Sequence, residues 1–242
     1  MRDAVSTSAA LTRTKVNGMH VLLVYVHPEP TSFTAALKDA AFEALRDAGH
    51  TVEVSDLYGE GFNPIAGRHD FQSAADPARF HYQTEQGHAH KTGTFAPDIV
   101  REQQRFMRAD LVVWFYPIWW GNVPAILKGW FDRVLAFGFA YSDGKRYHSG
   151  FFRDKKGILC LTSGGTRERF STNGVYGEMD QVLWSVQRLV IEYLGIQALE
   201  PFIAYAAPRV DQATREGYLE AWRARILEVA GGGDDCAAAR RA

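Results

Sequence analysis

The chain has 242 residues, of which 46% are hydrophobic and 23% charged, and this size and composition predict one domain around one substantial core. Its formal net charge of -1 excludes the strong positive field of a nucleic-acid-binding protein, and no nucleic-acid-binding motif occurs. The two cysteines, Cys160 in an apolar run and Cys236 in an Ala-rich segment, predict neither a disulfide framework nor a metal site. This cysteine usage favours a reducing, cytoplasmic compartment.

The two ends of the sequence differ in composition from the rest. Residues 1–18 carry charges and no apolar stretch, so we expect a flexible leader and not a signal peptide. Residues 231–242 are rich in Gly, Asp and Ala, and we expect a disordered tail. The longest run without charge, 111–127, contains Pro117 and Pro124, which would break a spanning helix. We therefore expect a soluble protein without stable membrane insertion, with its domain over residues 19–230.

Apolar runs rich in β-branched and aromatic residues alternate with segments of helical periodicity along the chain. This alternation predicts an α/β fold in which helices cover both faces of a parallel sheet. The strand runs are almost continuously apolar, as burial on both faces requires. The predicted strands are 19–26, 51–56, 111–116, 157–163 and 198–206, and the predicted helices are 33–48, 98–108, 123–136, 177–194 and 211–228.

Residues 58–97 interrupt the alternation. The segment is rich in Pro, Gly, Asn and His, and it is too long for a simple connection within a compact domain. We interpret it as an excursion that binds a ligand or forms a dimer.

The loop 27–33, after the first predicted strand, is the first candidate binding loop, because ligands of open α/β sheets bind outside the carboxyl ends of the strands. It contains neither G-x-G-x-x-G nor the P-loop motif, which argues against both of those nucleotide sites. It leads into a helix N-terminus, whose free amides and positive dipole can hold a phosphate. The alternative is that Thr31 and Ser32 only cap the helix while His27 closes a turn.

Two further loops carry candidates. The loop 116–124 is dense in large aromatic side chains, which must pack on a flat ligand such as a flavin or enter a dimer interface. After the fourth strand, Gly164 and Gly165 lack Cβ atoms, so their amides can approach a planar ligand closely. An ordinary glycine-rich strand exit has the same pattern.

Together these loops resemble those of the NAD(P)H:quinone oxidoreductase family, and the match spans most of 19–227. The resemblance implies a flavodoxin-like open parallel sheet of five strands in the order 2-1-3-4-5. It also implies a homodimer with the active site at its interface, one FAD per subunit, and hydride transfer from NADH or NADPH through the flavin to a small-molecule quinone. The matching segments are HPEPTSFTAALK (27–38), SDLYGEGFNPI (55–65), DPARFHYQ (76–83), PIWWGNVPAILKGWFDRV (117–134) and TSGG (162–165).

The resemblance also implies roles for individual residues. His81 would reach the cofactor of the partner subunit, and Tyr141 and Tyr193 would enter the partner's substrate pocket. Packing in the core or in an interface is the plain alternative for Tyr193. The other cofactor-binding candidates are His27, Phe33 and Thr34 at the FAD diphosphate, Pro117, Ile118, Trp119 and Trp120 along the isoalloxazine, Thr162, Ser163, Gly164 and Gly165 at its polar edge, and Arg215 and Leu219 at the adenosine end.

Two positions depart from the family pattern. Better-known members have a tyrosine and a histidine after the glycine loop, both thought to stabilise charge on the flavin, and here these positions hold Phe170 and Tyr176. Negative charge develops toward N1 and O2 of the flavin as hydride reaches N5, so a donor already in position lowers the barrier. Phe170 cannot donate, whereas Tyr176 can donate as a neutral phenol. The catalytic candidates are Tyr176, Gly164 and Trp120. All three also belong to the expected substrate pocket.

A rival hypothesis is a flavodoxin-like electron carrier or a regulatory flavoprotein subunit that acts by docking to a partner. Small carriers usually have a strongly acidic docking surface, and a net charge of -1 gives little support for one. Azo and nitro compounds are alternative acceptors to quinones. FMN is the alternative flavin, although the excursion 58–97 and Arg215 favour FAD.

Overall fold

The structure is a computed structural model that describes residues 18–231. The expected leader and tail, and Cys236 with them, lie outside the described residues, apart from Gly18 and Gly231. Within the part that is described, no helix has both the length and the apolar composition needed to cross a bilayer.

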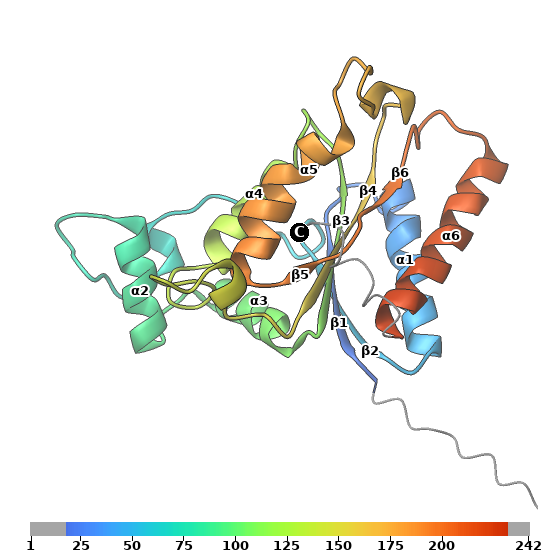
Figure 1. The fold of residues 1–242 in the computed structure, drawn as a ribbon. Coiled ribbons are helices and arrows are strands. Elements are labelled where there is room, and N and C mark those ends of the chain that lie inside the picture. The colour runs from blue at the N-terminus through green and yellow to red at the C-terminus, as the bar shows by residue number, and fades with distance from the viewer. Residues whose placement is uncertain (1–17, 232–242) are drawn as a thin grey trace, which may run out of the picture.

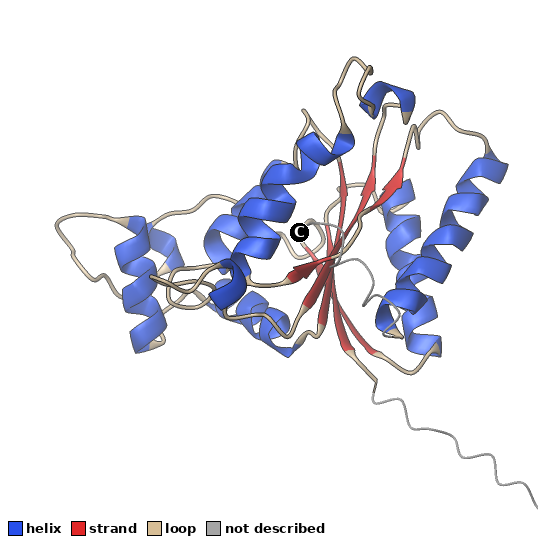
Figure 2. Ribbon diagram, in the orientation of Figure 1, coloured by secondary structure: helices blue, strands red, loops and turns tan. Residues whose placement is uncertain are grey.

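One all-parallel sheet forms the centre of the molecule, with strands in the order β2-β1-β3-β4-β5 (Figures 1 and 2). The central strand β3 is buried along its whole length, since it pairs with β1 on one side and β4 on the other. The α/β class and the predicted 2-1-3-4-5 order are confirmed. The strands are β1 (His20–Tyr25), β2 (Thr51–Asp56), β3 (Leu111–Pro117), β4 (Lys156–Thr162), β5 (Gln197–Ala198) and β6 (Phe202–Ala204).

The last position of the sheet differs from the single strand predicted over 198–206. Two short strands occupy it: β5 pairs with the start of β4, and β6 pairs with its end. Between the pairs Gly157↔Ala198 and Cys160↔Phe202, β4 advances by three residues and its partner by four, so one extra residue bulges out. Pro201 lies in this bulge and has no N–H to offer the ladder. The sheet therefore has six strands in five positions.

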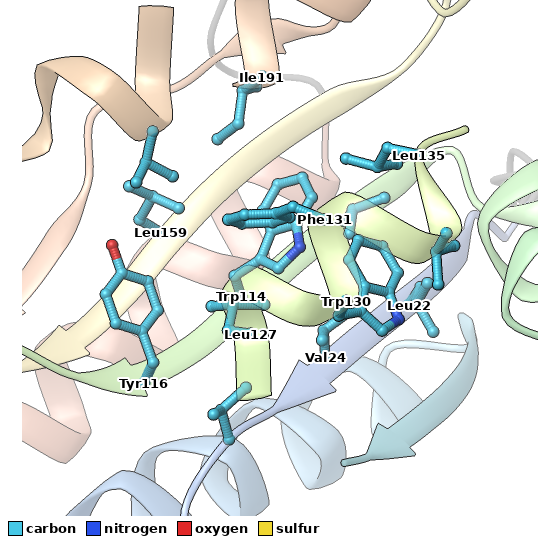
Figure 3. Packing of buried hydrophobic residues seen from close by; sticks show 14 of the residues in the cluster. Leu22, Val24, Trp114, Tyr116, Leu127, Trp130, Phe131, Leu135, Leu159 and Ile191 are labelled. Carbon is cyan, nitrogen blue, oxygen red and sulfur yellow. The ribbon is translucent and has the colours of Figure 1, made fainter. Parts of the chain in front are cut away.

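Alternate residues of the strands point to opposite faces and create two cores. Val21 and Leu23 face α1 (Phe33–Asp47) and α6 (Gln212–Ala230), and the indole N–H of Trp222 ties these two helices by donating to the carbonyl of Leu37 at 3.0 Å. Leu22 and its neighbours face the other helices, and Figure 3 shows Trp114, Trp130 and Phe131 packed there. The helices on this second face are α3 (Pro97–Arg108), α4 (Ala125–Val134) and α5 (Met179–Val186).

Two predicted helices are shorter in the structure. The helix expected from residue 123 starts at Ala125, because a residue that precedes proline, here Val123, disfavours helical backbone angles. The segment expected as one helix over 177–194 is α helical only in α5, then continues as a π turn, η4 (Gln187–Ile191), and a 3-10 turn, η5 (Glu192–Leu194). Gly195, at φ 90°, ends it in a left-handed cap.

The excursion 58–97 forms an arm that stands apart from the sheet layers (Figure 1). It contains a 3-10 turn, η1 (Arg68–Asp70), and a helix that the sequence analysis did not predict, α2 (Tyr82–Thr92). The buried face of α2 is largely polar. Glu85 accepts a hydrogen bond from the amide of Ala75 at 2.6 Å, and Gln86 bonds to main-chain groups near the end of α4. Apolar periodicity could not reveal a helix that is held by hydrogen bonds.

Arg133 of α4 anchors this arm to the rest of the domain. Its guanidinium is 1% exposed and lies 2.8 Å from the carboxylates of both Asp70 and Asp98. It also donates to the carbonyl of Asn63 at 2.6 Å. The hydroxyl of Tyr82 donates to the other oxygen of Asp70 at 2.7 Å, and burial together with this bond raises the pKa of Tyr82, which keeps the hydroxyl protonated. The start of α2, the start of α3 and the end of α4 thus meet at one buried cation.

Replacing Arg133 with Met should lower the free energy of unfolding by about 3 kcal/mol, because Asp70 would be left buried without its counter-ion. The matched control is Lys128→Met on the same helix. The Lys128–Asp132 pair is exposed and should contribute less than about 1 kcal/mol. Urea denaturation of the three proteins measures both values, and equal losses in the two variants would contradict the anchoring role.

Candidate active site

A cavity of about 680 Å³ opens at the carboxyl ends of β1, β3 and β4. It combines the loop after each of these strands with the start of α6. Ala36, Ala207, Pro208 and Gln212 also line it, although the sequence analysis did not single them out, and their small or uncharged side chains offered no signal. The predicted cofactor residues that the structure brings together here are His27, Phe33, Thr34, Pro117, Ile118, Trp119, Thr162, Ser163, Gly164, Arg215 and Leu219.

The N-terminus of α1 forms one end of this first cavity. The Ser32 hydroxyl caps the helix by accepting the amide of Ala35 at 3.1 Å, so the amides of Phe33 and Thr34 are left without an acceptor inside the helix. Capping and anion binding are therefore compatible here. The hydroxyl of Thr34 also lies 3.0 Å from that of Thr162, which joins the first and fourth strand loops in a buried contact.

His27 adds a neutral donor to the same end. Its Nδ1 accepts the amide of Glu29 at 3.0 Å, which assigns the ring proton to Nε2. Partial burial lowers the pKa of His27 against the smaller raising effect of Glu29, so the ring is uncharged at neutral pH. The site thus offers N–H groups for an anion without a fixed positive charge from this ring.

Arg215 supplies a second polar group that lacks a protein partner. It lines the first cavity, and its Nε is buried without a hydrogen-bond partner among residues 18–231. An unsatisfied buried donor costs about 1–3 kcal/mol, and a phosphate or sugar oxygen in the cavity would satisfy it. The cavity therefore suits a long ligand that carries an anionic group, such as a flavin nucleotide.

The aromatic loop after β3 forms a tight turn that separates two cavities. Trp119 and Asn122 exchange two backbone hydrogen bonds of 3.0 Å, and Trp120 and Gly121 both have positive φ, at 52° and 69°. These angles are those of a type I′ turn, which a bulky residue adopts only with strain. The turn exposes the Trp120 side chain completely, so Trp120 lines neither cavity, whereas Trp119 lines the first and Asn122 the second.

The second cavity, of about 930 Å³, lies between the arm, α4 and the segment that follows α5. It contains His81, Tyr141 and Tyr193, the three residues expected to act on the partner subunit. The rings of Tyr141 and Tyr193 pack edge to face, 5.6 Å apart. The structure thus places these three residues away from the cofactor candidates of the same chain.

The two glycines of the loop after β4 have different surroundings. Gly164 lines the first cavity, and a Cβ there would meet only the Arg209 guanidinium, at 3.8 Å. A Cβ on Gly165 would lie 2.7 Å from the ring of Phe170 and 3.1 Å from that of Tyr176. Gly165 therefore makes room for two protein rings, while Gly164 is the position at which a ligand can approach. Tyr176 itself is half exposed and lines neither of the two cavities.

Cys160 is buried within β4, and burial raises the pKa of its thiol. No three His, Cys, Asp or Glu side chains between residues 18 and 231 are grouped so that they could hold a metal ion.

Comparisons with known proteins agree with this geometry. A family model described as a flavodoxin-like fold matches residues 19–226. NAD(P)H dehydrogenase (quinone) 1 of Rattus norvegicus is 43% identical over 209 residues, covering 86% of this chain and 76% of that protein. Ribosyldihydronicotinamide dehydrogenase (quinone) of Homo sapiens is 40% identical over 213 residues, covering 88% and 92%. A solved structure described as a quinone reductase of Klebsiella pneumoniae superimposes with a TM-score of 0.84 at 35% identity, covering 88% and 85%.

Replacing Trp120 with Gly should raise the free energy of unfolding by about 1 kcal/mol, because it removes the left-handed strain of a fully exposed side chain. The control is Gly121→Ala, which introduces the same kind of strain at φ 69° in open space and should lower stability by a similar amount. Thermal and urea unfolding measure both. A destabilised Trp120→Gly would mean that the indole packs on the protein.

Proposed function

Because this chain belongs to the NAD(P)H:quinone oxidoreductases of the flavodoxin-like family, we propose that it transfers hydride from NADH or NADPH to a bound flavin and from the flavin to a quinone. The observation that carries this proposal is the first cavity. It joins an anion-binding helix N-terminus to the exits of the two central strands, and it contains the unsatisfied Nε of Arg215. The catalytic domain is proposed to span residues 19–230.

FAD fits the first cavity better than FMN does. The amides of Phe33 and Thr34 and the Nε2–H of His27 would hold a phosphate at the start of α1. Beyond that point the cavity continues along α6 to Arg215 and Leu219, where FMN has no atoms and the adenosine half of FAD does. Arg215 would then find its acceptor on the dinucleotide.

When bound, the flavin supplies N5 as the atom that receives and returns hydride. The protein's part is to orient the ring and to stabilise negative charge at its pyrimidine edge. Trp119 and Ile118 line the place where the ring would lie. The amide of Gly165 is already bonded to the hydroxyl of Ser163, at 3.1 Å, so Gly164 is the residue of this loop whose amide would serve the flavin.

Tyr176 is the proposed side-chain donor at that edge. Its oxygen accepts a hydrogen bond from Arg169 at 3.2 Å, which leaves its own proton free to be donated. Phe170 packs against the Tyr176 ring with centroids 5.1 Å apart, and both rings rest over Gly165. In this arrangement Phe170 would position the donor that lies beside it, although it cannot donate itself.

A homodimer would complete the site. Val175, Trp184 and Leu189 are exposed apolar residues in the loop before α5 and along the helical segment that follows, and Leu189 also lines the second cavity. Contiguous exposed apolar side chains are usually covered by a partner. Burial of this face against a second copy would bring His81, Tyr141 and Tyr193 of one subunit to the flavin and quinone of the other.

An electron carrier or regulatory flavoprotein is the second candidate function, and azo or nitro compounds are alternative acceptors. The net charge of -1 does not favour the acidic docking surface that carriers use. The free Cys160 fits a reducing, cytoplasmic compartment. Steady-state oxidation of NADH or NADPH with a soluble quinone separates the candidates, since a carrier would hold flavin that nicotinamides scarcely reduce.

The purified protein should be a yellow homodimer that releases FAD on denaturation. Chromatography of the released flavin and light scattering of the native protein measure the two properties. Release of FMN would contradict the assignment of the α6 end of the cavity. A monomer with full activity at nanomolar concentration would contradict the shared site.

Tyr176→Phe should slow flavin reduction by NAD(P)H by about tenfold while leaving flavin binding intact, because a half-exposed donor contributes less than the roughly 100-fold of a well-buried one. Stopped-flow reduction measures the rate. Phe170→Tyr, the companion variant in the same ring pair, should be neutral or mildly faster. An unaltered rate in Tyr176→Phe would transfer the stabilising role to the amide of Gly164.

A further inference from the structure

We propose that Arg167, Arg169 and Arg209 form a cationic rim beside the first cavity that binds the phosphates of a nicotinamide dinucleotide. The inference rests on the function proposed above and names the class of donor. Sequence identity does not make this choice, because relatives of similar identity are named for NAD(P)H and for ribosyldihydronicotinamide. The first donor carries an ionised diphosphate and the second carries none. Charge beside the cavity is therefore the property that separates them.

Arg209 places one guanidinium at the mouth of the cavity. It follows Pro208, which lines the cavity, and its amide closes a turn onto the carbonyl of Ala206 at 2.8 Å. Its Nη1 donates to the carbonyl oxygen of Gly164, the glycine at which a ligand can approach. The remaining N–H groups of this guanidinium are free to meet an anion.

Arg167 and Arg169 bring two more guanidiniums to the same place from the loop after β4, at the top of Figure 1. Arg169 bonds to the hydroxyl of Tyr176, and Arg167 lies 4.8 Å over the ring of Tyr205. The ring of Phe170 contacts both of these tyrosine rings, at 5.1 and 6.2 Å. Arg167 and Arg169 thus flank one aromatic cluster, whose Phe170 and Tyr176 rings lie over Gly165, the residue after the Gly164 that Arg209 contacts.

None of the three guanidiniums forms a salt bridge with a carboxylate of residues 18–231, and their contacts are a carbonyl, a hydroxyl and a ring. The charge of Arg167 contributes to the lowered pKa of the neighbouring Glu168 without a salt bridge between them. Arg105 and Arg133, by contrast, are each bound to two or more carboxylates. The carboxylates near the rim are engaged locally. Thr172 donates to Glu178, the amide of Thr214 donates to Asp211, and a hydrogen bond from Thr166 lowers the pKa of Glu168. Arginine stays charged at any physiological pH, so the rim keeps unused positive charge.

Guanidinium groups bind phosphate through paired N–H donors, which suits a diphosphate extending from a nicotinamide held over the flavin. The rim is exposed, so removing one arginine should weaken dinucleotide binding by about fivefold, and removing two by roughly twentyfold, with a strong dependence on salt. A donor without phosphate gains nothing from the rim. Arg167, Arg169 and Arg209 would then set the preference for a charged donor.

The test uses the flavin-loaded protein and its variants Arg169→Gln, Arg169→Lys and Arg167→Gln/Arg169→Gln, with Arg223→Gln as control. Arg223 is an exposed arginine farther along α6, so its loss changes the net charge equally. Calorimetry measures the affinity for ADP-ribose, which cannot be oxidised. Steady-state kinetics compare kcat/KM for NADPH with that for dihydronicotinamide riboside.

We expect ADP-ribose affinity to fall about fivefold in Arg169→Gln and roughly twentyfold in the double variant, with partial retention in Arg169→Lys and no change in Arg223→Gln. The NADPH to riboside ratio should fall in parallel. An unchanged affinity for ADP-ribose would contradict the proposed role of the rim. So would loss of flavin from the variants, or an equal loss of kcat/KM with NADPH and with the riboside. If the wild type oxidises neither donor but its ADP-ribose binding depends on these arginines, the proposed function fails and the rim stands.

Discussion

The whole site depends on the parallel pairing of β3 with β1 and β4. Parallel strands all end at the same edge of a sheet, so the loops after residues 25, 117 and 162 are forced to meet. Burial of β3 on both faces leaves no freedom to shift this register, because a shift of one residue would exchange the two apolar faces. The hydroxyl contact between Thr34 and Thr162, from segments far apart in sequence, is one result of that alignment.

A buried ion pair anchors the arm. Beside a small apolar cluster that includes Phe95, Ile99 and Ala136, the buried charge of Arg133 holds three segments together through polar contacts. A buried ion pair contributes little net stability compared with an apolar substitute, but it tolerates only one arrangement of its partners. The ion pair therefore fixes the position of the arm beside the second cavity, which His81 and other residues of the arm line.

Several local rules of protein structure are broken around the cavities. Trp120 adopts a left-handed conformation with its indole in solvent, and Arg215 keeps a buried donor that has no acceptor within residues 18–231. Arg209, which bonds to Gly164, and Arg167 and Arg169 in the loop after β4 form no salt bridge among residues 18–231, whereas Arg105 and Arg133 are paired with carboxylates. A ligand or partner can offset such costs at these places, which agrees with a cofactor site that is completed by other molecules.

The sequence by itself determined the α/β class, the position of most strands and the loops that line the first cavity, because these depend on short-range periodicity and on local signals such as the Ser32 cap. Only the tertiary structure decided the rest. Helix α2 is stabilised by partners 46 and 51 residues away, and the break between β5 and β6 arises from register against β4. The fold also decides which distant groups lie near a given residue. These groups determine whether an arginine has a carboxylate partner and whether a glycine faces a ligand or an aromatic ring. No local sequence pattern contains that information.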